Sequence, residues 1–161
     1  MTHILSDNVR AKIDEWLKRY PPDRKRSGVF EALRLAQEEN NGYLTEAIMN
    51  AVADYLEIPY IAVYEVATFY SMYRLKPLGK HVIEVCTNIS CMLTDVEKIV
   101  SYLQKKLGIG FSETTPDGRF TLKQVECLGA CVHAPVCQVG KKYYLKLTEE
   151  KVHEMLEELG G

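Results

Sequence analysis

One stretch of the sequence joins a strand pattern to a pair of cysteines: His81-Val82-Ile83-Glu84-Val85-Cys86-Thr87-Asn88-Ile89-Ser90-Cys91. Its first part is a short run rich in β-branched residues, which predicts a strand. Cys86 follows directly on that run, and Cys91 comes after a four-residue spacer. A thiol at this position would lie where the loops of an open α/β sheet build binding sites.

The residues after Cys91 continue an α/β pattern. Thr94-Asp95-Val96-Glu97 has the form of a capping box, which predicts the start of a helix. Further along the chain, the patterns predict a helical stripe from Val96 to Leu107, a strand from Phe120 to Glu126, a hairpin with strands at Val136–Val139 and Tyr143–Leu147, and a helix from Thr148. The strand–helix–strand order makes the first two strands parallel. The predicted α/β layer with its small mixed sheet resembles thioredoxin.

The first half of the chain carries helical patterns and no cysteine. Apolar residues recur at helical spacing within residues 9–20, 29–36 and 48–56, and an aromatic-rich stretch follows at 59–73. We expect an α+β protein with a helical bundle over residues 1–76 and a thioredoxin-like domain over 77–161. The aromatic residues between Tyr60 and Tyr73 are expected in the core of the bundle, with a protein interface as the alternative.

The amino-acid composition of the chain excludes some kinds of binding partner. The 161 residues include 20 basic and 22 acidic ones, for a net charge of -2. Nucleic acid is an unexpected partner, because binding phosphates requires a basic excess. No apolar run is long enough to span a bilayer, so direct membrane insertion is not expected. Residues 1–7 lack the basic and apolar regions of a secretory signal.

The five cysteines all lie in the second half of the chain, and four of them form two pairs. Cys86 and Cys91 are spaced C-x4-C, and Cys127 and Cys131 are spaced C-x3-C at the end of the second predicted strand. Parallel strands end at the same edge of a sheet, so we expect these four thiols to converge on a metal centre. Cys137 lies inside a predicted strand and is expected to be a core residue.

The spacing of the cysteines indicates which kind of metal centre they would hold. Structural zinc sites more often use C-x2-C knuckles, whereas C-x4-C occurs in plant-type ferredoxins. One [2Fe-2S] cluster is therefore favoured, and zinc is the main alternative. Rieske ligation needs two histidines with matching spacing, and a redox dithiol would prefer one C-x-x-C pair. We expect His81, His133 and His153 to be surface or strand-edge residues rather than ligands.

The motifs resemble the [2Fe-2S] thioredoxin-like ferredoxin subunit (the E type) of respiratory complex I, NADH:quinone oxidoreductase. The segments that carry the resemblance are Cys86–Cys91, Glu126–Cys131 with Ala134-Pro135, Val63–Ser71 and Thr115–Gly118. The resemblance implies that Cys86, Cys91, Cys127 and Cys131 hold the cluster. It also implies one-electron exchange with the FMN of a partner flavoprotein subunit that binds NADH, in the cytoplasmic peripheral arm of a membrane-associated complex. Subunits of NAD-linked hydrogenases and formate dehydrogenases share these motifs.

Other features complete these expectations. The only G-x-G motif, Gly108-Ile109-Gly110, follows a helix rather than a strand, so no hydride-transfer site is expected on this chain alone.

Residues 86–93 and 127–140 contain no Lys or Arg. With no cation to offset the charge of the reduced cluster, we expect a low reduction potential, on the order of -400 mV. A cis Ala134-Pro135 bond is the hypothesis suggested by thioredoxin relatives.

Overall fold

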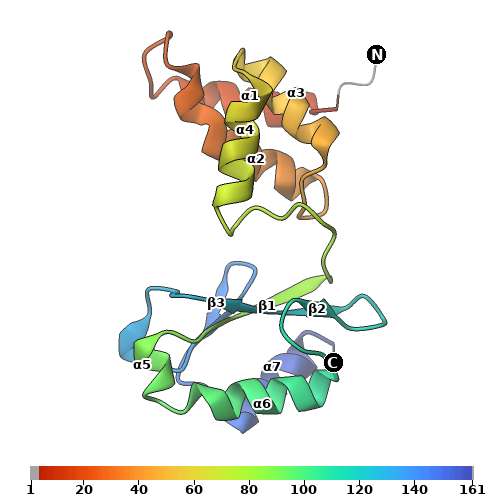
Figure 1. Ribbon diagram of the computed structural model, residues 1–161, viewed down its shortest axis with the longest axis vertical. Helices are drawn as coiled ribbons and strands as arrows, with labels where there is room; N and C mark the ends of the chain where they lie inside the picture. Colours follow the sequence, from red (N-terminus) through yellow and green to blue (C-terminus); the bar gives the residue numbers. More distant parts are fainter. Residues whose placement is uncertain (1–3, 161) are drawn as a thin grey trace. The chain divides into compact units, whose positions relative to one another are not determined.

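The computed structural model describes residues 4–160 (Figure 1). The structure leaves out Met1–His3 and Gly161. The first three of these residues belong to the segment 1–7 that is not expected to be a signal peptide. The chain divides into two compact units, with the division between Pro77 and Leu78. The two units are the helical unit before this point and the sheet unit after it.

The helical unit is built from short amphipathic helices. Its elements are α1 (Asp7–Leu17), η1 (Lys25–Gly28), α2 (Val29–Glu39), α3 (Glu46–Leu56) and α4 (Tyr60–Phe69). Side chains cap two of them: the Ser6 hydroxyl accepts the N–H of Val9 at 3.2 Å, and Thr45 accepts that of Ile48 at 3.2 Å. Fully buried side chains from α1, α2, α3 and α4 form one core, including Ile13, Leu33, Leu56 and Val63.

The aromatic stretch divides between this core and the surface. Tyr73 is 7% exposed, and its hydroxyl donates to the Phe30 carbonyl oxygen at 2.9 Å. Phe69, in contrast, is 79% exposed at the end of α4, and Tyr60 is 51% exposed at its start. The expectation of a core position is confirmed for Tyr73 and is wrong for Phe69 and Tyr60. The reason is that α4 is apolar on most sides, whereas only one side of it packs on the bundle.

The sheet unit holds a five-stranded mixed sheet in the order β2-β3-β1-β4-β5. Its strands are β1 (His81–Cys86), β2 (Glu113–Thr114), β3 (Phe120–Val125), β4 (Cys137–Val139) and β5 (Lys142–Tyr144). As the sequence predicts, β1 and β3 are parallel, and the other pairs are antiparallel. The helices are α5 (Ile89–Met92), α6 (Val96–Leu107) and α7 (Glu149–Glu158), with the short η2 (Cys131–His133).

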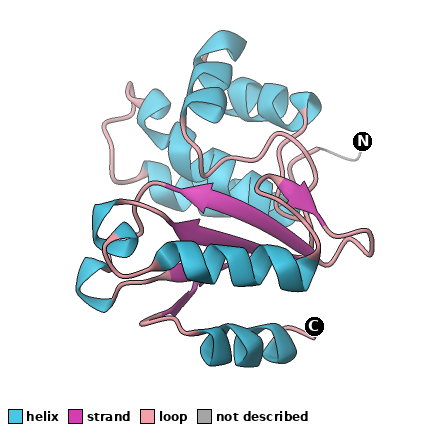
Figure 2. Ribbon diagram, turned by 60° about the horizontal axis from the view of Figure 1, so that its bottom comes forward, coloured by secondary structure: helices cyan, strands magenta, loops and turns pink. Residues whose placement is uncertain are grey.

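Helices α6 and α7 lie side by side on one face of this sheet (Figures 1 and 2). Ile83 and Val85 of β1 and Leu122 of β3 point into the core between the sheet and these helices. Leu103 of α6 and Met155 of α7 close that core from the other side, and all five are at most 1% exposed. This packed layer fixes where β1 and β3 end.

Two details of the sheet unit differ from the sequence-based expectations. The residue before α6 is Asp95, with a left-handed φ of 62° and no side-chain cap, so the predicted capping box is wrong. The Thr94 hydroxyl instead donates to the carbonyl oxygens of Ser90 and Cys91, at 3.0 Å each, because it closes the turn of α5. Strand β5 ends at Tyr144 rather than Leu147, since Lys146 adopts a positive φ of 49°.

Three further observations complete the fold. The Ala134–Pro135 peptide bond is cis. Gly108 ends α6 as a helix cap with a φ of 68°, so the G-x-G motif belongs to a helix end, as expected. Within residues 4–160, no helix has both the length and the hydropathy needed to cross a membrane.

Candidate metal centre

The parallel register of β1 and β3 places two cysteines at one edge of the sheet. Cys86 is the last residue of β1 and lies opposite Val125, the last residue of β3. Cys127 comes two residues after that strand end. Cys91 and Cys131 belong to α5 and η2, which pack against each other next to this edge. The fold therefore brings both predicted pairs to the same region.

The second pair is preformed and open to solvent. The Sγ atoms of Cys127 and Cys131 lie 3.9 Å apart, and both residues are exposed. Between them, Gly129 has a φ of +72°, a conformation that favours glycine, and its N–H donates to the Cys127 Sγ at 3.3 Å. The C-x3-C loop is thus shaped by a glycine turn that directs one backbone donor at a sulfur.

The first pair is buried. Cys86 is 3% exposed and Cys91 is 2% exposed. Burial, together with the neighbouring Cys86, raises the pKa of the Cys91 thiol to about 11, and a backbone hydrogen bond from Val136 acts in the opposite direction. Cys91 lies in α5 and Cys131 in η2, and the packing of these two elements makes the two pairs neighbours. The Cys86 thiol donates to the Glu126 carbonyl oxygen at 3.4 Å.

The distance between the two exposed sulfurs fits a pair of thiolates that share one metal ion. Two sulfurs bound to one tetrahedral metal at ~2.3 Å lie about 3.8 Å apart, which matches the 3.9 Å between Cys127 and Cys131. A [2Fe-2S] cluster takes two thiolates per iron, which two adjacent cysteine pairs can supply.

Supporting hydrogen bonds hold the loops that carry the thiols. The Tyr143 hydroxyl of β5 donates to the Leu128 carbonyl oxygen at 3.0 Å. The Gln124 side-chain amide donates to the Thr87 hydroxyl at 2.7 Å, which joins the ends of β3 and β1. Sequence reasoning missed these residues and Gly129. A glycine between closely spaced cysteines is a signal that could have revealed the turn, whereas the Tyr143 contact depends on strand pairing and leaves no local signal.

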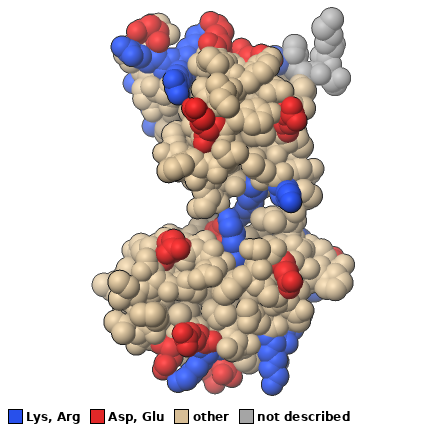
Figure 3. Space-filling model, viewed as in Figure 1, with Lys and Arg blue, Asp and Glu red and all other residues tan. Residues whose placement is uncertain are grey.

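An uncharged surface surrounds the thiols. Residues 86–93 and 127–140 contain no Lys, Arg, Asp or Glu. Several large apolar side chains in these segments are exposed, among them Ile89 (65%), Leu93 (76%) and Val132 (85%). Figure 3 shows that charged side chains gather toward α6 and α7, whereas the region around α5 is largely free of them in this view. We call Ile89, Met92, Leu93 and Val132 the apolar rim.

The remaining cysteine and the histidines lie apart from this arrangement. Cys137 is fully buried, with its thiol 3.7 Å from the Met155 sulfur, which confirms its expected place in the core. His81 packs against the Phe120 ring, with 5.7 Å between ring centroids. His153 lies on α7, 3.4 Å from the Glu157 carboxylate. His133 is exposed at the end of η2, two residues after Cys131.

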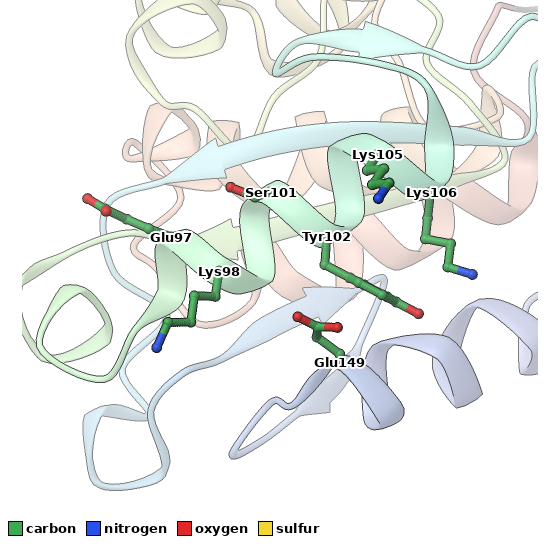
Figure 4. Close-up of a pocket in the computed structure, with 7 residues that line it drawn as sticks. All are labelled: Glu97, Lys98, Ser101, Tyr102, Lys105, Lys106 and Glu149. Atoms are coloured by element: carbon green, nitrogen blue, oxygen red, sulfur yellow. The ribbon is translucent and has the colours of Figure 1, made fainter.

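A separate hollow of about 800 Å³ lies along α6, away from the thiols. It is lined by Glu97, Lys98, Ser101, Tyr102, Lys105, Lys106 and Glu149. Figure 4 shows these side chains fanning out around the helix rather than converging on one point. Their charges have both signs, and Lys98 pairs with Asp95 at 3.1 Å and Lys106 stacks over the Tyr102 ring. The hollow has the character of a solvated helix face.

The sheet order, the packed helices and the two thiol pairs at a sheet edge define a thioredoxin-like protein. Comparison with known proteins makes the assignment specific. The family model for thioredoxin-like [2Fe-2S] ferredoxins matches residues 13–160. The chain belongs to this family.

Relatives of known name cover most of the chain. The E subunit of NADH-quinone oxidoreductase from Rickettsia felis is 49% identical over 145 residues, which are 90% of this chain and 87% of the relative. The E 2 subunit of the same enzyme from Rhizobium meliloti is 42% identical over 149 residues, 92% of this chain and 87% of the relative. The chain is thus similar to these subunits over nearly their whole length.

A solved structure shares the fold. The chain superposes on part of an NAD+-reducing [NiFe]-hydrogenase, solved in the H2-reduced state, with a TM-score of 0.72 and 17% identity. The match covers 82% of this chain and 22% of that chain. At this identity the likeness establishes the fold and nothing further.

Proposed function

We propose that this chain is the electron-transfer subunit of an NADH:quinone oxidoreductase and that it holds one [2Fe-2S] cluster through Cys86, Cys91, Cys127 and Cys131. The observation that carries the proposal is the meeting of the two thiol pairs at the shared edge of β1 and β3. The names of the relatives support the enzyme, and the family supports the kind of cluster.

The chain's own residues position the group and control its surroundings. The cluster, when bound, supplies a reversible one-electron acceptor. The buried Cys86 and Cys91 would hold the cluster from the packed core, and the exposed Cys127 and Cys131 would hold it from the surface. Gly129 and Val136 direct backbone dipoles at the thiolates of Cys127 and Cys91. In this proposal the segments around the thiols supply no positive side chain, which favours a low reduction potential.

The electron donor in this proposal is FMN, bound by a partner flavoprotein subunit that takes a hydride from NADH. The hydride chemistry belongs to that partner. The exposed pair Cys127 and Cys131 faces outward beside the apolar rim, a surface suited to exclude water when a partner covers it. The complex places this chain in a cytoplasmic peripheral arm, attached to the membrane through other subunits.

An NAD-linked hydrogenase is the second candidate for the whole complex, because subunits of such enzymes share the motifs around the four cysteines. In that case the chain's residues have the same roles, but the complex passes electrons between hydrogen and NAD+. Co-purification separates the two candidates. Mass spectrometry of the native complex identifies either quinone-reductase subunits or a nickel–iron subunit.

The decisive experiment measures cofactor content and reduction together. The purified chain is expected to contain iron and acid-labile sulfide in equal amounts, to be red-brown, and to give an electron paramagnetic resonance signal after dithionite. NADH is expected to reduce it only when the flavoprotein is present. A colourless protein that binds zinc, even after anaerobic reconstitution with iron and sulfide, would contradict the proposal and favour a zinc-stabilised interaction module.

A further inference from the structure

The exposed thiol pair has the geometry of a dithiol that can be oxidised. The Sγ atoms of Cys127 and Cys131 lie 3.9 Å apart, and both residues are exposed. A disulfide bond requires the two sulfurs to approach to about 2.0 Å. The loop between them has room for this movement, because no atom lies within 4 Å of a Cβ placed on Gly129. A small adjustment of the loop is therefore enough to join the sulfurs.

The packing of the loop keeps the two sulfurs close to each other. Leu128 and Ala130, on either side of Gly129, are partly buried and pack on the core of the sheet unit. The Tyr143 hydroxyl donates to the Leu128 carbonyl oxygen at 3.0 Å. Because these contacts anchor the loop, a thiol that has reacted with an oxidant still has the second thiol beside it at high effective concentration.

The other three thiols are protected from a dissolved oxidant. Cys86, Cys91 and Cys137 are at most 3% exposed. The Cys86 thiol donates to the Glu126 carbonyl oxygen, and the Cys137 thiol lies beside the thioether of Met155, which cannot form a disulfide. Exposure is a condition for cysteine reactivity, so an oxidant in solution selects the exposed pair.

We propose that, before the cluster is inserted, Cys127 and Cys131 form a reversible disulfide bond by exchange with a low-molecular-weight disulfide such as oxidised glutathione. The bond blocks insertion of the cluster, because it consumes two of the four thiolates that would hold the iron. This consequence for the cluster rests on the proposed function, whereas the disulfide bond itself does not. Insertion of the cluster thereby depends on the thiol redox state of the surroundings.

The reaction consists of two exchange steps. The thiolate of one cysteine attacks a sulfur of oxidised glutathione, breaks its S–S bond and releases one glutathione. The second cysteine attacks the mixed disulfide, forms the bond between Cys127 and Cys131 and releases the other glutathione. The protein loses two electrons and two protons, and the two molecules of reduced glutathione carry both. A dithiol reductant reverses the reaction by the same two steps.

Peptide mapping of the full chain tests the disulfide bond. The chain is freed of iron under reducing, oxygen-free conditions, incubated with oxidised glutathione, denatured in N-ethylmaleimide and digested with trypsin. Cleavage after lysine leaves Cys86 and Cys91 in residues 81–98 and the other three cysteines in residues 124–141. We expect two labels on the first peptide, and one label, on Cys137, together with an internal disulfide on the second. Three labels on residues 124–141, or a disulfide within residues 81–98, would overturn the proposal.

Two matched variants identify the partners of the bond. Cys131→Ser cannot complete the second exchange step, so it is expected to retain glutathione on Cys127. Cys137→Ala is expected to form the disulfide at the wild-type rate, because this thiol is buried beside Met155. A Cys137→Ala chain that is folded by circular dichroism and forms no disulfide would make Cys137 a partner of the bond and contradict the assignment.

Cluster insertion tests the block separately. Oxidised and reduced chains receive iron and sulfide without oxygen, and the cluster absorbance is followed with time. The oxidised chain is expected to gain the cluster about tenfold more slowly, because its disulfide must first be reduced. Prior treatment with a phosphine reductant should restore the rate. Equal rates would refute the block and leave the proposed function intact. A reduced chain that gains no cluster would refute the proposed function, and the peptide map would still decide whether the disulfide forms.

Discussion

The Tyr143 hydroxyl donates a hydrogen bond to the Leu128 carbonyl oxygen, at 3.0 Å. The β4–β5 hairpin thereby holds the loop that carries the exposed cysteine pair. Tyr143→Phe removes this bond, whose net worth is about 1 kcal/mol, so the loop opens ~5-fold more often. We expect the cluster absorbance to decay correspondingly faster in air. Tyr144→Phe is the control, because the Tyr144 hydroxyl contacts Glu158 instead, and an equal effect of both changes would contradict this role.

Cys137 is expected to matter for stability and not for the cluster. Its thiol is fully buried against Met155, so Cys137→Ala leaves a small cavity and lowers the free energy of unfolding by about 1 kcal/mol. Iron and sulfide content should stay at the wild-type level, whereas Cys91→Ala should abolish cluster binding. Loss of the cluster in Cys137→Ala, with the fold intact by circular dichroism, would show that the site extends to this thiol.

The same thiol gives a pH dependence of stability. Burial raises the pKa of Cys137 from 9.0 to about 12. Between these values the unfolded chain has lost this proton and the folded chain retains it, so stability falls as pH rises, by about 1.4 kcal/mol per unit. The stability advantage of wild type over Cys137→Ala should therefore shrink between pH 8 and pH 10, measured by denaturant unfolding. An advantage that is constant with pH would contradict the raised pKa.

Glu57 ends α3 in a left-handed conformation with a φ of 56°. A residue with a Cβ atom is strained there, and glycine is not. Glu57→Gly should raise the free energy of unfolding of the helical unit by about 0.5 to 1 kcal/mol, after the greater chain entropy of glycine is subtracted. The exposed ion pair between Glu57 and Lys25 contributes little. Glu57→Ala separates the two effects, since it removes the ion pair and keeps the strain.

The apolar rim should contact the flavoprotein. Leu93 is 76% exposed beside the thiols, and an aspartate there would place a charge against an apolar partner surface and near an anionic cluster. Leu93→Asp is expected to weaken association by more than tenfold, with cluster content unchanged, as measured by calorimetry. Ser101→Asp, on the solvated face of α6, serves as the control. Equal effects of the two changes would remove the rim from the interface.

Phe69 tests whether the exposed end of α4 is a second contact. Its ring is 79% exposed and packs edge-on against Tyr70, with centroids 5.0 Å apart. Phe69→Ala should leave the thermal unfolding temperature nearly unchanged and weaken subunit association. The matched change Tyr73→Ala should instead lower the stability by about 3 kcal/mol, because Tyr73 is buried. Association that is unaffected by Phe69→Ala would remove the interface interpretation.

Sequence patterns were sufficient for the parts of the fold that repeat over several residues. The β-branched run in His81–Cys86 and the helical stripe of Val96–Leu107 predict β1 and α6, and the strand–helix–strand order predicts the parallel pairing of β1 with β3. The expected meeting of the cysteine pairs follows from that pairing alone. The spacing of the cysteines left zinc as an alternative to an iron–sulfur cluster, because thiolates bind both zinc and iron.

Other features could not be predicted because their causes are tertiary. Helix α5 has four residues, too few for a periodic pattern, and the turn it forms captures the Thr94 hydroxyl that the sequence assigns to a capping box. The exposure of Phe69 depends on which side of α4 packs on the bundle. One cysteine pair is buried and the other is exposed, because the two loops lie at different depths in the packed layer. The buried residues are Cys86 and Cys91, and the exposed ones are Cys127 and Cys131.

The alignment of Cys86 with Val125 has an implication for how such chains can diverge. Strand pairing, rather than the polypeptide that connects α5 to β3, sets the separation of the two cysteine pairs. Insertions or deletions near the Asp117-Gly118 turn should therefore be tolerated with the sulfurs in place. A single residue added between Val125 and Cys127 would instead rotate the second loop away from the first.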